Sequence, residues 1–332
     1  MADETGAFAV QEEVQGGWRK FIDDLAPLRP DLFRYCCGLT GNVWDGEDLV
    51  QDVLAKTFAQ LGKVNAQLTH PRAYLIRAAT NLWIDRLRRA SLERAHAAAV
   101  EAEAPPPADD ASQVVDVRAA ANGLFLHLAP RERAAVLLAE VLDFSLEETA
   151  SMLKTTVGAV KAALSRGRAR LRAAQAAPPS PWATPREVVD RFVAALTAKD
   201  FDAIRALCLA DVTVDMSGGP TFDGYEVGKT TVEHAHFVAP QFGLHDAPRW
   251  EVAVVQGEPV AIGFRTQDGV EGLNEVWRFE MGEGGVSRLR LYCFSPDVLV
   301  AVAKELGVPV LRRPYRSWPY GPSGPPLRPE VD

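Results

Sequence analysis

Two proline-rich segments divide this sequence and limit how any fold can run along it. The first, residues 95–112, contains three consecutive prolines at positions 105–107, and the second, residues 176–185, reads AAPPSPWATP. Proline has no amide hydrogen and cannot continue a helix interior, so each segment predicts a linker. The remaining chain forms three modules and a Pro/Gly-rich tail: residues 1–94, 113–175, 186–312 and 313–332.

The 332 residues are enough for each module to bury its own hydrophobic core. No stretch approaches the roughly 18 apolar residues of a membrane-spanning helix, and the acidic N-terminus lacks the features of a secretion signal. The four cysteines include no C-x-x-C spacing. The sequence therefore predicts a cytoplasmic protein with reduced thiols and without a metal site, a cofactor or membrane association.

Positive charge is concentrated in two short segments of an acidic chain. The net charge is -8, yet residues 71–94 carry six arginines against two acids, and residues 154–172 carry six basic residues and no acid. For the basic run 161–172 the alternative explanation is a solvated helix end, because cations favour helix C-termini. Charge this strongly localised instead favours two particular DNA-contacting surfaces over a general affinity for polyanions.

The first two modules show helical periodicity. Residues 45–61 predict an amphipathic helix with an acidic solvent face, and residues 71–89 predict a basic helix that begins at Pro71. Ser145 and Glu148 form a capping box at the start of a further helix. After a short turn, a helix from Val157 to about Ala174 completes a helix-turn-helix, with small residues at its start and basic residues along its outer face.

The third module has a different pattern. Residues 185–208 predict two helices, residues 211–218 a strand, and residues about 225–237 a further helix. Four segments with strand propensity then follow, separated by turns rich in glycine and acidic residues. Helices followed by an antiparallel meander predict an α+β domain.

These segments resemble a known family. The stretches GEDLVQDVLAKTF, PRAYLIRAATNLWIDRLRR and LAPRERAAVLLAEVLDFSLEETASMLKTTVGAVKAALSRGRARLR resemble regions 2 and 4 of extracytoplasmic-function (ECF) sigma-70 factors, over roughly residues 18–174. Residues 186–295 resemble a SnoaL-like domain of the nuclear transport factor 2 superfamily. The resemblance implies a multidomain protein with a region 2 helical bundle, a region 4 helix-turn-helix and a cone-shaped α+β domain.

The resemblance also implies partners and site residues. The partners are core RNA polymerase and promoter DNA, with a possible small-molecule ligand of the C-terminal domain; no anti-sigma partner is identifiable. The residues implied for polymerase binding are Asp45, Glu47, Asp48, Gln51 and Asp52. Those for the -10 element are Asn65, Gln67, His70, Arg72, Arg77, Asn81, Arg86 and Arg88. Those for the -35 element are Thr156, Val157, Gly158, Lys161, Ser165, Arg166 and Arg168.

Two residues depart from the family pattern. Lys154 occupies the turn position that usually holds glycine, where a positive φ would cost a non-glycine residue on the order of 1 kcal/mol. Trp83 replaces a smaller residue, and core packing is favoured over contact with the DNA strand.

The C-terminal module leaves its role open. The residues expected to line its cavity are Asp215, His234, Trp250, Arg265, Asn274, Glu275, Trp277 and Tyr292. No acid/base pair is identifiable from spacing, so regulation or ligand sensing is favoured over catalysis. The alternatives are a SnoaL-like isomerase or cyclase with a DNA-binding N-terminal part, and a plain helix-turn-helix repressor. The repressor leaves residues 45–89 without a purpose.

Overall fold

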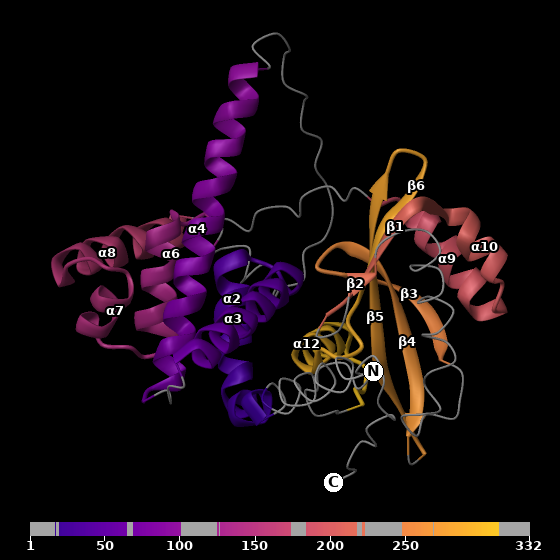
Figure 1. Cartoon of the computed structure of the whole chain (residues 1–332), viewed down its shortest axis with the longest axis horizontal. Helices are drawn as coiled ribbons and strands as arrows, with labels where there is room; N and C mark the ends of the chain where they lie inside the picture. The colour runs from indigo at the N-terminus through magenta and orange to yellow at the C-terminus, as the bar shows by residue number, and fades with distance from the viewer. Residues whose placement is uncertain are drawn as a thin grey trace, which may run out of the picture. The chain divides into compact units, whose positions relative to one another are not determined.

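The computed structural model forms two compact units, which are described separately. One unit is Pro27–Pro181, and the other combines Met1–Ala26 with Trp182–Asp332. Figure 1 shows the helical and sheet-containing parts of the chain. The residues that the structure describes are 17, 20–64, 69–100, 125, 127–173, 184–217, 221–222, 248–267 and 269–311.

The N-terminal half of the first unit is a helical bundle. After the short 3-10 helix η1 (Ala26–Leu28), α2 (Arg29–Thr40), α3 (Val43–Val64) and α4 (Pro71–Val100) pack together. Leu49 and Val53 of α3 are completely buried, which confirms the predicted apolar face. The Tyr35 and Thr80 hydroxyls hydrogen-bond at 2.7 Å and connect α2 to α4 inside this core.

The helix α4 is longer than the sequence analysis predicted. It continues to Val100, whereas the linker was expected to begin at residue 95. The first proline of the linker is Pro105, and the alanine-rich stretch before it favours helix. The prolines therefore correctly predicted that the helix ends before Pro105, but they did not predict at which residue it ends.

The second half of this unit contains the predicted helix-turn-helix. The helix α6 (Pro130–Val136) continues into a π-helical turn (Leu137–Val141), and α7 (Leu146–Met152) and α8 (Val157–Ala173) follow. The Ser145–Glu148 capping box at the start of α7 is present with both of its hydrogen bonds. Lys154 has a φ of 49°, which confirms that lysine holds the left-handed position of the turn.

The other unit is an α+β domain, as predicted. The helices α9 (Arg186–Ala198) and α10 (Phe201–Leu207) precede a six-stranded sheet of order β2-β1-β6-β5-β4-β3. Strands β3 to β6 form the predicted antiparallel meander, and β1 pairs in parallel with β6. The strands are β1 (Cys208–Met216), β2 (Thr221–Phe222), β3 (Arg249–Val255), β4 (Glu258–Gln267), β5 (Val270–Gly282) and β6 (Gly285–Leu291).

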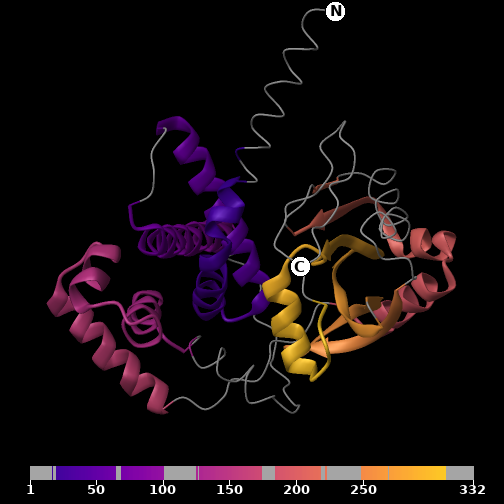
Figure 2. The ribbon, with the colours of Figure 1, turned by 90° about the horizontal axis from the view of Figure 1, so that it is seen from below.

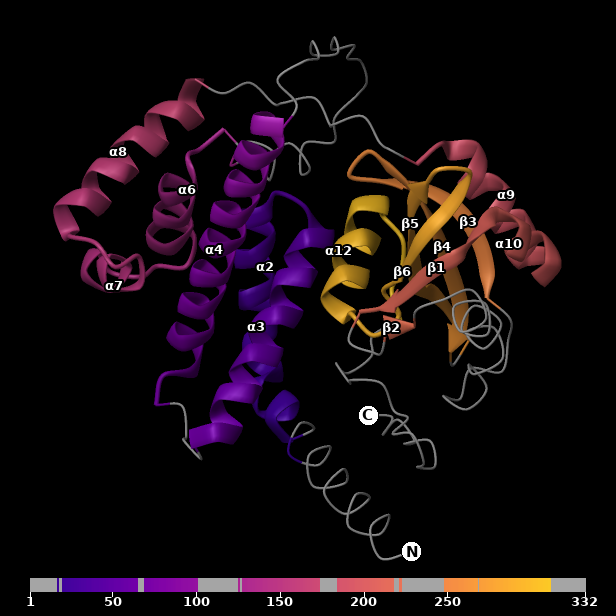
Figure 3. The ribbon, with the colours of Figure 1, turned by 45° about the horizontal axis from the view of Figure 1, so that its top comes forward.

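Helices cover both faces of this sheet. The helices α9 and α10 lie on one face, and α12 (Pro296–Leu306) lies on the other (Figures 1, 2 and 3). The hydrophobic core beneath α9 includes Phe192, whose ring meets those of Trp277 and Phe279 edge to face. No helix among the described residues is both long and apolar enough to cross a membrane.

Candidate polymerase and nucleic-acid interfaces

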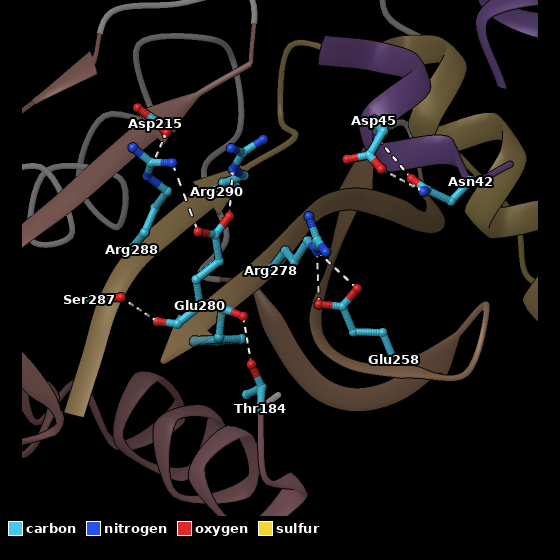
Figure 4. Close-up of polar contacts among 11 residues, drawn as sticks. Asn42, Asp45, Thr184, Asp215, Glu258, Arg278, Glu280, Ser287, Arg288 and Arg290 are labelled. Carbon is cyan, nitrogen blue, oxygen red and sulfur yellow. Dashed lines mark hydrogen bonds and ion pairs between the residues drawn. The ribbon is translucent and has the colours of Figure 1, made fainter. Parts of the chain in front are cut away.

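The outer face of α3 presents the predicted acidic residues at its N-terminal half. Asp45 is exposed and forms reciprocal hydrogen bonds with Asn42: the Asp45 amide donates to Asn42 Oδ1 at 2.7 Å, and Asn42 Nδ2 donates to Asp45 Oδ2 at 2.8 Å (Figure 4). Asp52 is 56% exposed, and Asp48 and Gln51 are half-buried. We call these four residues the acidic face of α3.

Glu47 does not belong to this face. Its side chain is completely buried and pairs with Arg29, the first residue of α2, which is also buried. Gln51 Nε2 donates a further hydrogen bond to the same carboxylate at 2.7 Å. The expectation that Glu47 contacts polymerase is therefore wrong, because the side chain is used inside the bundle.

The basic residues of α4 fall into an exposed group and a paired group. Arg77 and Arg88 are exposed, and His70 is exposed just before the helix begins. Arg86 forms an ion pair with Asp52, so it joins α4 to the acidic face of α3. Arg72, Asn81 and Arg86 are half-buried; Asn65 and Gln67 lie outside the described residues.

The N-terminal half of α8 is an open surface of small and basic residues. Thr156 caps the helix, because its hydroxyl accepts a hydrogen bond from the Ala159 amide at 3.2 Å. Val157 is half-buried. The residues that are exposed on this surface are Thr156, Gly158, Lys161 and Ser165. These exposed residues of the predicted set therefore lie on one helix.

The arginines in the C-terminal half of α8 also have partners within the protein. Arg166 and Arg170 donate to the two carboxylate oxygens of Glu132, each at 2.8 Å, and Arg168 pairs with Glu140 at 2.6 Å. Glu132 is only 5% exposed. Although burial alone would raise the pKa of Glu132, its hydrogen bonds from Arg166 and the Ala129 amide and the nearby charges lower it overall.

The sequence analysis missed Glu132. Its position in α6 follows the helix pattern, but nothing local indicates that residues 34 and 38 positions later will bind it. The ion pairs show that Arg166 and Arg170 fix α8 on α6, and both arginines remain at least half exposed.

The interior of the C-terminal domain contains a buried polar cluster around Glu275. Arg265 donates to Glu275 Oε1 at 3.1 and 3.3 Å, and Asn274 Nδ2 donates to the same oxygen at 3.3 Å. Trp277 Nε1 donates to Oε2 at 3.2 Å. Trp250 packs edge to face on Trp277. The predicted residues Trp250, Asn274 and Trp277 therefore gather beside an Arg–Glu pair.

Asn274 reaches this cluster because the strand is irregular at that point. Gly263 pairs with Glu275 and Phe264 pairs with Leu273, so Asn274 is the extra residue of a β-bulge in β5. A bulge redirects a side chain that would otherwise alternate to the other face. Asn274 is 1% exposed, and its Oδ1 accepts no hydrogen bond from the described residues.

Asp215 lies on the other face of the sheet. Its neighbours Val214 and Met216 belong to the core beneath α9, so its own side chain points away from that core. There it pairs with Arg288 at 3.2 Å, in a row of charges that continues through Glu280 to Arg290 (Figure 4). The expectation that Asp215 shares a cavity with Trp250 and Trp277 is wrong.

The remaining two residues that were predicted to line the cavity are Tyr292 and His234. Tyr292 is buried but does not belong to the core cluster beneath α9, and His234 lies outside the described residues.

On the same outer face as Asp215, Arg278 binds both carboxylate oxygens of Glu258, at 2.8 and 2.9 Å (Figure 4). In the part of the chain that the structure describes, no group of three side chains is arranged to hold a metal ion.

Comparison with known proteins decides the family. Residues 25–93 match the family Sigma-70 region 2, and residues 122–171 match Sigma-70, region 4. The RNA polymerase sigma-E factor of Streptomyces coelicolor is 34% identical over 143 residues, which cover 42% of this chain and 77% of that protein. The chain belongs to the ECF group of sigma-70 factors. Region 2 of this sigma factor therefore contains α2, α3 and α4, and region 4 contains α6, α7 and α8.

Other relatives extend further along this sigma factor. ECF RNA polymerase sigma factor SigG of Mycobacterium tuberculosis is 29% identical over 268 residues, which cover 71% of this chain and 70% of that protein. The crystal structure of the ECF sigma factor SigJ of M. tuberculosis is 22% identical; the match covers 84% of this chain and 98% of that chain, with a TM-score of 0.33.

Membership in this family gives the general activity. Sigma factors bind core RNA polymerase and direct transcription initiation at promoters, and they are not enzymes.

Proposed function

We propose that this sigma factor binds core polymerase through the acidic face of α3, holds the -10 element with α4, and reads the -35 element with α8. The observation that carries the proposal is the open surface of α8, where Thr156, Gly158, Lys161 and Ser165 are exposed. Small residues let the helix backbone approach a DNA groove closely, and hydroxyl groups can bond base edges or phosphates.

Phosphate contacts complete the assignment. Arg166 and Arg168 are 60% and 58% exposed. Each guanidinium can therefore donate hydrogen bonds to DNA phosphates while it remains ion-paired with its glutamate. On α4, the exposed Arg77 and Arg88 serve the opened -10 strand, with His70 at the start of the helix. Arg72, Asn81 and Arg86 complete the proposed set.

The test is transcription with purified components. Core polymerase freed of other sigma factors is mixed with the full chain and with fragmented genomic DNA from the source organism. Discrete transcripts are expected only when both proteins are present. A chain that fails to bind core polymerase, or that binds DNA specifically without it, would support the repressor alternative and contradict the proposal.

We infer that the C-terminal domain, proposed as residues 186–312, adjusts this activity and has no catalytic role. Glu275 is the buried acid beside Trp250 and Trp277, and four hydrogen bonds already engage its two oxygens. A carboxylate held in this way is a poor general base, because proton transfer requires an accessible lone pair. The proposed place of action is the cytoplasm, where core polymerase and promoter DNA are found.

The buried Asn274 side chain supports the proposal that a ligand binds in this interior. Its Oδ1 is buried and accepts nothing from the described residues, and such an atom is costly unless a donor reaches it. A small molecule with an N–H or O–H donor and an apolar body suits Asn274 and the two tryptophans.

Removal of residues 186–332 tests the regulatory role. The truncated chain is expected to bind core polymerase and to initiate at the same promoters with a changed yield of RNA. Circular dichroism of the truncated chain checks that its helices are retained. Equal yields from the full and truncated chains would contradict regulation, and turnover of a substrate by the full chain would favour the isomerase alternative.

A further inference from the structure

A short segment after α12 completes one edge of the strand β5. The register of β6 on β5 covers residues 277–282 of β5. Closer to the start of β5, residues 309–311 run parallel to it and form a bridge to Leu273. The Leu273 amide donates to the Pro309 carbonyl at 2.8 Å, and the Leu311 amide donates to the Leu273 carbonyl at 3.0 Å. We call residues 309–311 the strap.

The strap fits against β5 because Gly272 has no side chain. A Cβ atom at Gly272 would lie 2.9 Å from the Leu311 amide nitrogen, 3.0 Å from the Val310 carbonyl carbon and 3.2 Å from Leu311 Cδ2. The leucine side chain therefore fills the space that the glycine leaves. Gly272 is the register partner of Arg265, and register partners face the same side of a sheet. Leu311 thus lies on the side of the sheet that carries the Arg265–Glu275 pair.

The strap also lies beside the buried acceptor to which a ligand has been assigned. Leu311 follows the bridge on the strap as Asn274 follows it on β5. Leu311 is 7% exposed and Asn274 is 1% exposed, and Asn274 Oδ1 accepts no hydrogen bond from the described residues. A molecule from solvent can reach this oxygen only after an element that covers it has moved.

The strap is the described element near Asn274 that is most easily moved. Within the described part of the chain, two backbone hydrogen bonds attach it to β5, whereas β4 pairs with β5 through seven residue pairs. Segments with few backbone hydrogen bonds open locally at a small fraction of the free energy of global unfolding. Opening of the strap therefore requires much less free energy than separation of the strands.

We propose that the strap closes the ligand site of the C-terminal domain and that a bound ligand takes the place of Leu311. The apolar body of the ligand occupies the space beside Gly272, its donor binds Asn274 Oδ1, and the strap leaves β5. The inference rests on the proposed ligand and states what that ligand changes in the protein. Because bound ligand and docked strap exclude each other, binding is converted into the release of a chain segment.

Two variants weaken the strap from opposite sides. Leu311→Ala removes the side chain that fills the site, and Gly272→Ala places a Cβ atom against the strap backbone. The matched control is Val270→Ala, which shortens a 58% exposed side chain on the same strand. Circular dichroism and thermal unfolding of the full chain check that each variant keeps its fold.

The probe is 2-naphthol, which carries one O–H donor on an apolar body, and calorimetric titration of the full chain measures its affinity. Only molecules with an open strap bind, so the apparent affinity is proportional to the open fraction. Leu311→Ala and Gly272→Ala should each bind about tenfold more tightly than wild type. A leucine that merely lined the site would lose ligand contacts on truncation, and the affinity would fall. The analogue 2-methoxynaphthalene lacks the donor and should bind more weakly, because it leaves Asn274 unpaired.

Hydrogen exchange on the full chain reports the strap itself. The amides of Leu273 and Leu311 donate the two hydrogen bonds that attach the strap. Saturating 2-naphthol should raise the exchange rates of both amides by about tenfold or more, because it keeps the strap off β5. The two strap variants should raise the same rates without ligand, and Val270→Ala should leave them unchanged.

The outcomes separate this inference from the proposed ligand. If 2-naphthol binds wild type but Leu311→Ala and Gly272→Ala bind it equally or more weakly, the strap inference is overturned while the ligand proposal stands. The same conclusion follows if binding leaves the exchange of Leu273 and Leu311 unchanged or slows it. A probe that binds neither wild type nor the two strap variants contradicts the proposed ligand class and the displacement together.

Discussion

At the residue scale, burial separates side chains that look alike in the sequence. Glu47 and Asp48 are adjacent acids on α3, but Glu47 is buried against Arg29 and Asp48 reaches the surface. The sequence pattern identified the acidic face and could not exclude Glu47 from it, because the partner lies 18 residues upstream on another helix. The alternation in β1 did carry a usable signal: Val212, Val214 and Met216 are apolar, which places Asp215 on the opposite face.

The adjacent acids give a direct prediction. Glu47→Ala leaves Arg29 buried without its carboxylate and should lower the free energy of unfolding by about 3–5 kcal/mol. Asp48→Ala should change stability by less than about 0.5 kcal/mol and should weaken binding to core polymerase. Chemical denaturation and a core-binding titration measure the two effects. Equal loss of stability in the two variants would contradict the assignment.

At the element scale, the attachment of α8 to α6 depends on Glu132. The helix-turn-helix was predictable because its signals are local: a capping box, a turn and a helical period. The ion pairs that orient α8 were not predictable, since they join α8 to a helix 34 positions earlier. The same distinction applies to α4, whose beginning at Pro71 was predicted and whose end at Val100 was not.

Glu132 predicts a pH dependence. Its pKa is lowered in the folded protein, so it contributes stability above its unfolded pKa, near 4.5, and this contribution is lost as the pH falls through the folded pKa. Glu132→Gln should lower the free energy of unfolding at neutral pH by about 1–3 kcal/mol, and the difference from wild type should shrink below pH 4.5. Urea denaturation at a series of pH values measures this.

The control for Glu132 is Glu140→Gln, because Glu140 is 32% exposed and has Arg168 as its one ion-pair partner among the described residues. A partly exposed pair of this kind contributes at most about 1 kcal/mol. A difference between Glu132→Gln and wild type that stays constant across the pH series would show that the lowered pKa does not matter for stability.

The surface of α8 predicts how two basic residues differ. Lys161→Ala should weaken promoter binding by the polymerase complex and lower the slope of affinity against salt by about one unit, without a change in stability. Arg166→Ala should show the same loss together with a lower free energy of unfolding, because it also releases Glu132. Arg205→Ala, on α10, serves as the control with an unchanged slope. A Lys161→Ala variant with the wild-type slope would remove this residue from the DNA interface.

At the scale of the whole molecule, the distribution of charge and the order of the motifs along the chain predicted the activity. They predicted the boundaries between the modules less well. Two basic segments in a protein of net charge -8 indicated two DNA-contacting surfaces, and the family match confirms the sigma-factor interpretation. The proline-rich segment suggested separate modules, yet regions 2 and 4 form one compact unit. Within that unit the guanidinium of Arg133, in α6, stacks over the ring of Trp83, in α4, and no local sequence pattern reveals this pairing.

The central claim is that two surfaces on one chain recognise two promoter elements while polymerase fixes the distance between them. The most direct test maps a transcription start made by core polymerase with this protein, and then inserts about five base pairs, half a helical turn, between the two elements. The account predicts that the insertion abolishes the transcript, and that a matched insertion upstream of both elements leaves it unchanged. A transcript of equal yield from the template with the altered spacing would contradict the account.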